Sequence, residues 1–235
     1  MSVRIRRVTT TRAGGVSAAP FDSFNLGDHV GDDPSAVAAN RARLAATIGL
    51  GADWVVWMNQ VHGDRVEMVD GPRDAPIDDT DALVTRTPRL ALAVVSADCV
   101  PVLMGDARAG VVAAVHAGRV GAADGVVARA LQAMLAVGAH EHDISVLLGP
   151  AVSGRNYEVP AAMADEVEAA LPGSRTTTSA STPGLDLRAG IARQLKALGV
   201  YAVDVDPRCT VDDVSLFSHR RGAPTGRLAS VVWME

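Results

Sequence analysis

Residues 90–118 read LALAVVSADCVPVLMGDARAGVVAAVHAG, and this stretch decides the fold class. It contains apolar runs at 90–97, 100–104 and 110–116, and several of them are apolar at every position. Such β-branched runs are typical of strands that are buried on both faces. The sequence therefore predicts a sheet at the centre of the molecule with covering layers on both sides.

Working outward, further strands are predicted at 3–9, 54–58, 65–69, 81–85, 144–148, 201–205 and 227–234. Helices are predicted at 34–48, 122–137, 160–171 and 186–198, several of them ended by glycine. Between the first strand and the first helix, residues 12–33 form a long stretch without periodicity, which is typical of a functional loop. Strands come in runs rather than alternating with helices, so an α/β (α+β) fold with helices outside the sheets is favoured over a regular βαβ repeat.

Composition excludes several classes of function. The chain has 235 residues and a net charge of −5, with 3 Trp, 2 Tyr and 3 Phe. An acidic balance with so few aromatic rings argues against a nucleic-acid partner. Lys196 is the only lysine, so no P-loop motif can be written.

The same composition bears on location. Polar residues follow the basic N-terminal segment where a signal peptide needs its apolar stretch, and no apolar run is long enough for a membrane helix. The 2 cysteines, Cys99 and Cys209, do not make a disulfide framework. We expect a cytoplasmic protein without a membrane partner.

Three predicted strands end in a residue that can bind a metal or act as a nucleophile. His62 follows the run at 54–58, Cys99 follows the run at 90–97, and His116 ends the run at 110–116. Two imidazoles and one thiolate suffice for a tetrahedral zinc with one open position, where zinc lowers the pKa of a bound water. The spacing matches no compact zinc-finger pattern, and each residue alone is equally typical of a buried structural group.

The residues around these three resemble a known family. Gln60-Val61-His62-Gly63, Ala97-Asp98-Cys99-Val100-Pro101 and His116-Ala117-Gly118 are similar to the signature blocks of the YfiH/YlmD-type family. That family is described as multicopper polyphenol oxidoreductase or laccase domain, and also as purine nucleoside phosphorylase. The resemblance continues through Asn25-Leu26-Gly27 near the N-terminus and Thr225-Gly226-Arg227 near the C-terminus.

The resemblance implies a function and a set of site residues. His62, Cys99 and His116 are the implied ligands of zinc. Phosphorolysis of adenosine, inosine, guanosine and methylthioadenosine is implied, together with hydrolytic deamination of adenosine. Cys99, His116 and Asp98 are the predicted catalytic residues, with Asp98 as an acceptor that orients a ligand or as a turn cap. The predicted contacts for purine nucleoside or phosphate are Arg12, Asn25, Arg41 and Arg220.

One block departs from the family pattern, since His116-Ala117-Gly118 continues as Arg119-Val120-Gly121 where the family has Trp-Arg-Gly. We expect a single domain over residues 1–235, layered α/β/β/α, as a monomer or weak homodimer. Two other enzymes stay open. One is a copper-dependent polyphenol oxidase with Met104 as axial ligand, and the other is a metal-free hydrolase with Cys99 as nucleophile and His116 as base. A non-enzymatic binding protein is the remaining alternative.

Overall fold

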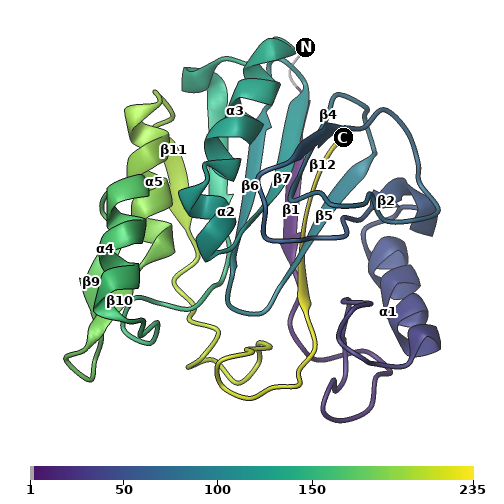
Figure 1. Cartoon of the computed structure of the whole chain (residues 1–235). Helices are drawn as coiled ribbons and strands as arrows, with labels where there is room; N and C mark the ends of the chain where they lie inside the picture. Colours follow the sequence, from purple (N-terminus) through teal and green to yellow (C-terminus); the bar gives the residue numbers. More distant parts are fainter. Residues whose placement is uncertain (1–2) are drawn as a thin grey trace.

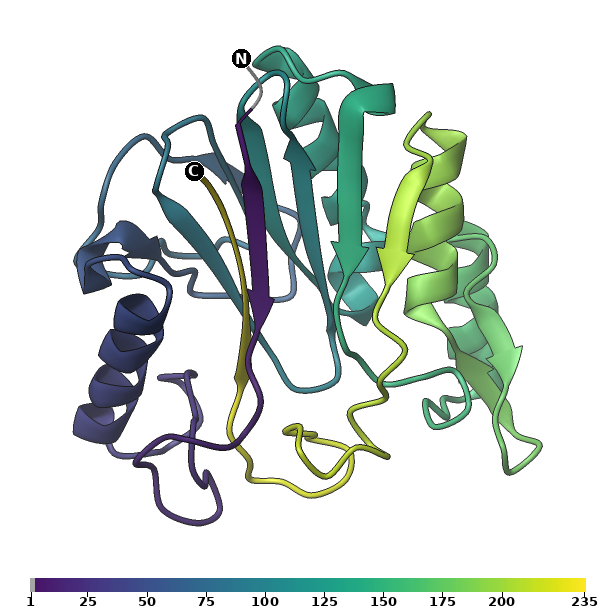
Figure 2. The ribbon, with the colours of Figure 1, turned by 180° about the vertical axis from the view of Figure 1, so that it is seen from behind.

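Two β-sheets packed face to face form the centre of the molecule, as Figures 1 and 2 show from opposite sides. The structure is a computed structural model that describes residues 3–235. Both sheets are mixed, and helices cover their outer faces, so the chain forms a single α/β domain with the predicted α/β/β/α layering.

The larger sheet has six strands in the order β11-β8-β6-β7-β4-β3. Its centre is the antiparallel pair β6 (Val100–Asp106) and β7 (Val111–Ala117), both fully buried. The other members are β11 (Ala202–Val205), β8 (Ile144–Leu148), β4 (Ala82–Thr85) and β3 (Val66–Met68). The predicted buried runs therefore form the middle of the sheet, where both faces are covered.

The smaller sheet has four strands in the order β1-β12-β5-β2. Its centre is β12 (Leu228–Met234) beside β5 (Ala91–Ser96), with β1 (Ile5–Thr9) and β2 (Val55–Val56) at the edges. The first and last strands of the chain are thus hydrogen-bonded neighbours.

Helices form the two outer layers. Helix α1 (Pro34–Thr47) packs on the smaller sheet through Leu44 and Ala45. Helices α3 (Val126–Ala136), α4 (Ala161–Ala170) and α5 (Leu187–Ala197) pack on the larger sheet. A third apolar cluster, with Leu92, Leu103 and Val112, lies between the sheets.

Two local predictions are wrong and one pair of strands is missing from the predictions. The helix predicted at 122–137 is two helices, α2 (Arg119–Ala123) and α3, because Gly125 between them has φ +89°. The strand predicted at 54–58 is shorter, since a 3-10 turn at Ala52–Trp54 precedes β2. The hairpin of β9 (Arg175–Thr177) and β10 (Pro183–Leu185) was not predicted.

The stretch at 12–33 is irregular, as predicted, and hydrogen bonds with buried asparagines fix its backbone. Asn40 of α1 donates hydrogen bonds to the backbone carbonyls of Ser23 and Asn25. Asn25 is fully buried and accepts from the backbone N–H of Gly27 and of Arg227. A remaining 3-10 turn lies at Glu141–Asp143, and no helix within residues 3–235 has the length and apolar character to cross a membrane.

Candidate metal centre

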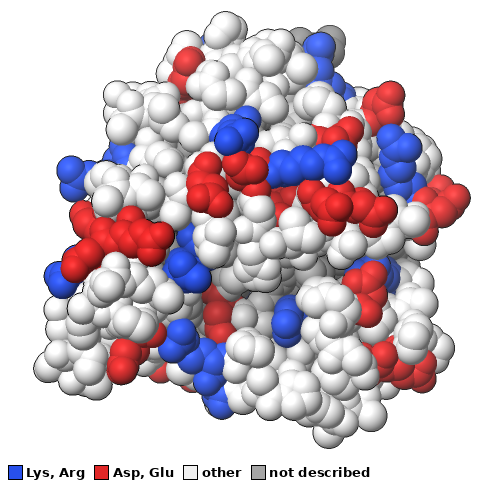
Figure 3. All heavy atoms as spheres, in the orientation of Figure 1, with Lys and Arg blue, Asp and Glu red and all other residues white. Residues whose placement is uncertain are grey.

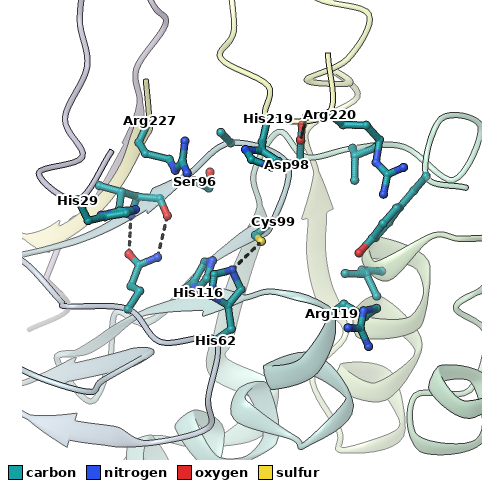
Figure 4. Close-up of a pocket in the computed structure, with 16 residues that line it drawn as sticks. His29, His62, Ser96, Asp98, Cys99, His116, Arg119, His219, Arg220 and Arg227 are labelled. Carbon is teal, nitrogen blue, oxygen red and sulfur yellow. Dashed lines mark hydrogen bonds between the residues drawn. The ribbon is translucent and has the colours of Figure 1, made fainter. Parts of the chain in front are cut away.

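His62, Cys99 and His116 come together at one end of the two sheets (Figure 4). Their ligand atoms all lie within 4.8 Å of one another, and Cys99 Sγ lies 3.8 Å from His62 Nε2. The two imidazole rings meet edge to face, with centroids 4.8 Å apart. The connections β2–β3 and β5–β6 both pass from the smaller to the larger sheet, so they carry His62 and Cys99 to the end of β7, where His116 lies.

Asp81 orders the two histidines. Its Oδ1 lies 2.8 Å from His116 Nδ1 and accepts a hydrogen bond from the backbone N–H of His62. Its Oδ2 accepts from the backbone N–H groups of Val61 and Gly63. These bonds stabilise the turn in which His62 has φ +63°, a left-handed conformation that is uncommon outside glycine. With Nδ1 of His116 on the carboxylate, Nε2 is the nitrogen available to a metal.

Sequence reasoning missed Asp81 and offered Asp98 for this role. The sequence signal for Asp81 was its position directly before a fully buried strand. A carboxylate that is buried there requires hydrogen-bond partners. In the structure, Asp98 Oδ1 accepts from the hydroxyls of Thr210 and Ser218, while Oδ2 accepts from the backbone N–H of Arg220. Asp98 therefore holds the 210–220 loop over the site, which corresponds to the turn-capping alternative.

The electrostatics of the cluster favour a thiolate. Burial opposes ionisation of Cys99, but the charges and hydrogen bonds of His116 and His62 outweigh it and lower the thiol pKa to about 6. Burial likewise opposes the charge on His116, but Cys99 and Asp81 outweigh it and raise the imidazole pKa to about 9. Both shifts favour an ion pair between the Cys99 thiolate and the His116 imidazolium in the metal-free site.

Two glycines allow the segment that follows His116 to pass close to His62 and Cys99. A Cβ on Gly118 would lie 2.7 Å from His62 Cδ2 and 3.3 Å from Cys99 Sγ. A Cβ on Gly121 would overlap the carbonyl oxygen of Gly63. The first turn of α2 therefore packs directly on the turn that carries His62.

A cavity of about 580 Å³ opens above the cluster. Charged side chains of both signs are scattered over the mainly uncharged face shown in Figure 3, and a hollow opens in its lower half with basic and acidic side chains beside it. The cavity combines the three clustered side chains, other polar groups and a few apolar ones. Its lining residues are His29, Gln60, His62, Val95, Ser96, Ala97, Asp98, Cys99, His116, Arg119, Val152, Tyr157, Leu187, His219, Arg220 and Arg227.

Of the four predicted substrate contacts, only Arg220 lines this cavity. Arg12 forms an ion pair with Asp22, at 3.0 Å. Arg41 lies 4.2 Å above the Trp57 ring and binds Asp28. Arg12, Asn25 and Arg41 thus hold the N-terminal loop, and the structure does not bring them into the cavity.

Other lining residues carried weaker sequence signals. His29, from the irregular stretch at 12–33, lines the cavity. Gln60, which pairs with the backbone of Val95, and Arg227 lie in the blocks that carry the family resemblance, but sequence reasoning gave them no role. Ser96 and His219 were also missed. Ser96 ends the buried strand β5, whereas nothing in the local sequence of His219 distinguishes it from a surface residue, because the cavity forms only when distant loops meet.

The donor set fits a transition metal. Two imidazole nitrogens and one thiolate, with a cavity on their open side, match a zinc site that keeps one position for substrate. Met104, the axial ligand considered for copper, is instead fully buried between the larger sheet and its helices.

Comparison with known proteins agrees with the geometry. Residues 6–235 match the family described as multi-copper polyphenol oxidoreductase laccase. The chain is 80% identical to a purine nucleoside phosphorylase of Mycobacterium tuberculosis, covering 100% of this chain and 94% of the relative. It is 58% identical to one of Corynebacterium glutamicum, covering 98% of this chain and 94% of the relative.

Solved structures match over the whole fold. The Bacillus licheniformis hypothetical protein YfiH superposes with a TM-score of 0.91 at 30% identity, covering 100% of this chain and 97% of that one. YlmD from Geobacillus stearothermophilus gives a TM-score of 0.91 at 32% identity, covering 98% of this chain and 92% of that one. This chain therefore belongs to the multi-copper polyphenol oxidoreductase laccase family, whose fold it shares with YfiH and YlmD.

Proposed function

We propose that this protein is a purine nucleoside phosphorylase whose active site is the cavity above His62, Cys99 and His116, with zinc as its metal. One observation carries the proposal: three candidate metal ligands lie in a cavity that is also lined by three arginines with no carboxylate partner among residues 3–235. The names of the relatives from Mycobacterium tuberculosis and Corynebacterium glutamicum support the same activity.

The charge of the cavity suits an anionic co-substrate. Among residues 3–235, Arg119, Arg220 and Arg227 form no ion pair. Asp98 is the carboxylate that lines the cavity, and hydrogen bonds from within the chain occupy both of its oxygens. In a chain with a net charge of −5, this local excess of guanidinium groups favours phosphate.

Phosphorolysis needs a bound phosphate next to the sugar carbon that bears the base. A phosphate oxygen forms a bond to C1′, the glycosidic C–N bond breaks, and its electron pair leaves with the base, which takes up a proton. Guanidinium groups from the three arginines of the cavity would bind and orient the phosphate, and the apolar lining, with Val95 and Val152, would limit competing water. A zinc ion bound by the three donors would supply a Lewis acid.

The proposed substrates are adenosine, inosine, guanosine and methylthioadenosine. We extend the proposal to hydrolytic deamination of adenosine, in which water adds to C6 and ammonia leaves. This second reaction uses water and no phosphate, so phosphorolysis depends on added phosphate whereas deamination does not. The metal site is common to both.

The test is an assay of base release from inosine or adenosine with and without phosphate, with metal content measured on the same sample. We expect phosphate-dependent hypoxanthine or adenine, stoichiometric zinc, and loss of both metal and turnover in Cys99→Ala and His116→Ala. Stoichiometric copper with a thiolate colour band and oxidation of a phenol would instead support the polyphenol oxidase. A covalent acyl group on Cys99 of chelated protein would support the metal-free hydrolase.

A further inference from the structure

The cavity has two different walls, one on each side of the cluster of His62, Cys99 and His116. Arg119 and Arg220 lie on one side of Cys99, whereas His29, Ser96 and Arg227 lie on the other (Figure 4). Tyr157 belongs to the first side, because the guanidinium of Arg220 lies over its ring. The first wall therefore carries two guanidinium groups and the second carries one. If two substrates share the cavity, the more highly charged one should bind to the wall with two cations.

Arg220 is held in a fixed position on the first wall. Its backbone N–H donates to Asp98 Oδ2 at 2.8 Å, and its guanidinium lies 4.7 Å above the Tyr157 ring. One side-chain nitrogen, Nη1, donates to the carbonyl of Glu158 at 3.2 Å. The ring and this hydrogen bond position the guanidinium, and its other N–H groups have no partner among residues 3–235.

Arg119 completes the wall from the first position of α2. Its side chain makes no hydrogen bond or ion pair within the described part of the chain. It lies close enough to Tyr157 to act on it: burial raises the pKa of the Tyr157 hydroxyl, and the charges of Arg119 and Arg220 both oppose that rise. Two guanidinium groups without carboxylate partners thus flank one tyrosine.

We propose that orthophosphate binds to the wall formed by Arg119, Tyr157 and Arg220. The nucleoside then occupies the opposite side, near His29, Ser96 and Arg227. This assignment rests on the proposed function, since it requires both substrates in one cavity. It gives Arg119 a specific role as a phosphate-binding residue.

The second wall is less suited to a dianion. Arg227 is a single cation, and its Nη1 already donates to the carbonyls of Thr225 and Gly226. Its serine and histidine neighbours suit the hydroxyl groups of a neutral ribose. Tyr157 is also a poor stacking partner for a purine on the face that Arg220 covers.

The experiment separates the two substrates by steady-state kinetics of the zinc-loaded enzyme. Arg119→Met and Arg220→Met should each raise the KM for phosphate by about 10-fold or more, with the KM for inosine changed much less. Arg119→Lys should recover part of the loss, because it keeps the charge. Arg227→Met should leave the KM for phosphate nearly unchanged. Arg43→Met, on the exposed side of α1, is the matched control.

A calorimetric titration with orthophosphate supplies a readout besides activity. Wild-type protein should bind phosphate, and Arg119→Met should bind it at least about 10-fold more weakly with its zinc content unchanged. An unchanged phosphate KM in both wall variants, or a rise confined to the inosine KM, would overturn the assignment. Absence of phosphate-dependent base release from wild type would overturn the proposed function instead, and the titration would still decide whether this wall binds phosphate.

Discussion

Asp81 is a fully buried carboxylate that hydrogen-bonds to the backbone of His62 and to the side chain of His116. Burial raises its pKa, but the hydrogen bonds from His116 and from the backbone of Val61 and Gly63 outweigh burial and lower the pKa below the usual value. The folded state therefore favours the ionised form. The contribution of the ionised Asp81 to the free energy of unfolding is fully present at pH values above the pKa of Asp81 in the unfolded chain. It is lost as the pH falls through the lower pKa of Asp81 in the folded state.

Asp81→Asn tests this role at nearly constant volume. An amide presents an NH₂ group to donors that need an acceptor, so we expect destabilisation of about 1–3 kcal/mol. We also expect zinc affinity to fall by about 10–100-fold, since the carboxylate orients His116. Urea unfolding of metal-free protein and competition with a chromophoric chelator measure the two effects. Asp79→Asn, at an exposed neighbour, is the control, and equal zinc affinity in both variants would refute the orienting role.

The Cys99 thiolate gives the second prediction for a single residue. With a pKa of about 6, half of the thiol is ionised near pH 6, and the thiolate is lost as the pH falls below that value. In metal-free Cys209→Ser protein, which leaves one thiol, the rate of alkylation by iodoacetamide should rise with a midpoint near pH 6. His116→Ala should move that midpoint upward, because the imidazolium is removed. A midpoint near 9 in the parent protein would contradict the ion pair.

At the level of elements, helix α2 packs against the turn at residues 62–63 that carries His62. It begins directly after β7, and its Gly121 lies against the backbone of Gly63 in the turn that carries His62. The contact leaves no room for a side chain. The distance between α2 and this turn therefore sets the position of His62 relative to His116.

Gly121→Ala should push α2 away from the 62–63 turn. We expect a loss of about 1–3 kcal/mol in stability from overpacking, together with weaker zinc binding as His62 is displaced. Gly71→Ala is the matched control, because a Cβ at that position meets nothing within 4 Å. Thermal unfolding and zinc titration of both variants check the prediction. Zinc affinity equal to wild type in Gly121→Ala would show that this contact does not position His62.

The elements that the sequence predicts well are those whose pattern is set by burial on both faces. Strands β5, β6 and β7 are buried at every position and mostly apolar, and they lie in the middle of the two sheets. The errors occur where a short-range signal competes with packing. Gly125 interrupts a helical pattern that continues on both sides, and the β9–β10 hairpin contains polar threonines that give no alternation.

At the scale of the whole molecule, the site depends on how the two sheets are connected. The sequence singles out the three donors because each lies at the end of an apolar strand, and the family resemblance implies that they are metal ligands. It does not predict Asp81, Arg227 or His219, whose proximity arises when the chain crosses between sheets and the 210–227 loops fold over the cavity. Long-range contacts of this kind leave no periodic pattern in the chain, whereas strand ends do.

Because His62 and Cys99 lie on connections between the sheets and His116 ends a strand of the larger one, metal binding should stabilise the domain as a unit. Zinc at about 100 times its Kd should add about 2.7 kcal/mol to the free energy of unfolding. In calorimetry we expect one transition that moves to higher temperature with zinc in wild type and in Cys209→Ser, but not in Cys99→Ser. A zinc-dependent shift that persists in Cys99→Ser would place the stabilising ion elsewhere, and a second transition without zinc would show that the sheets unfold separately.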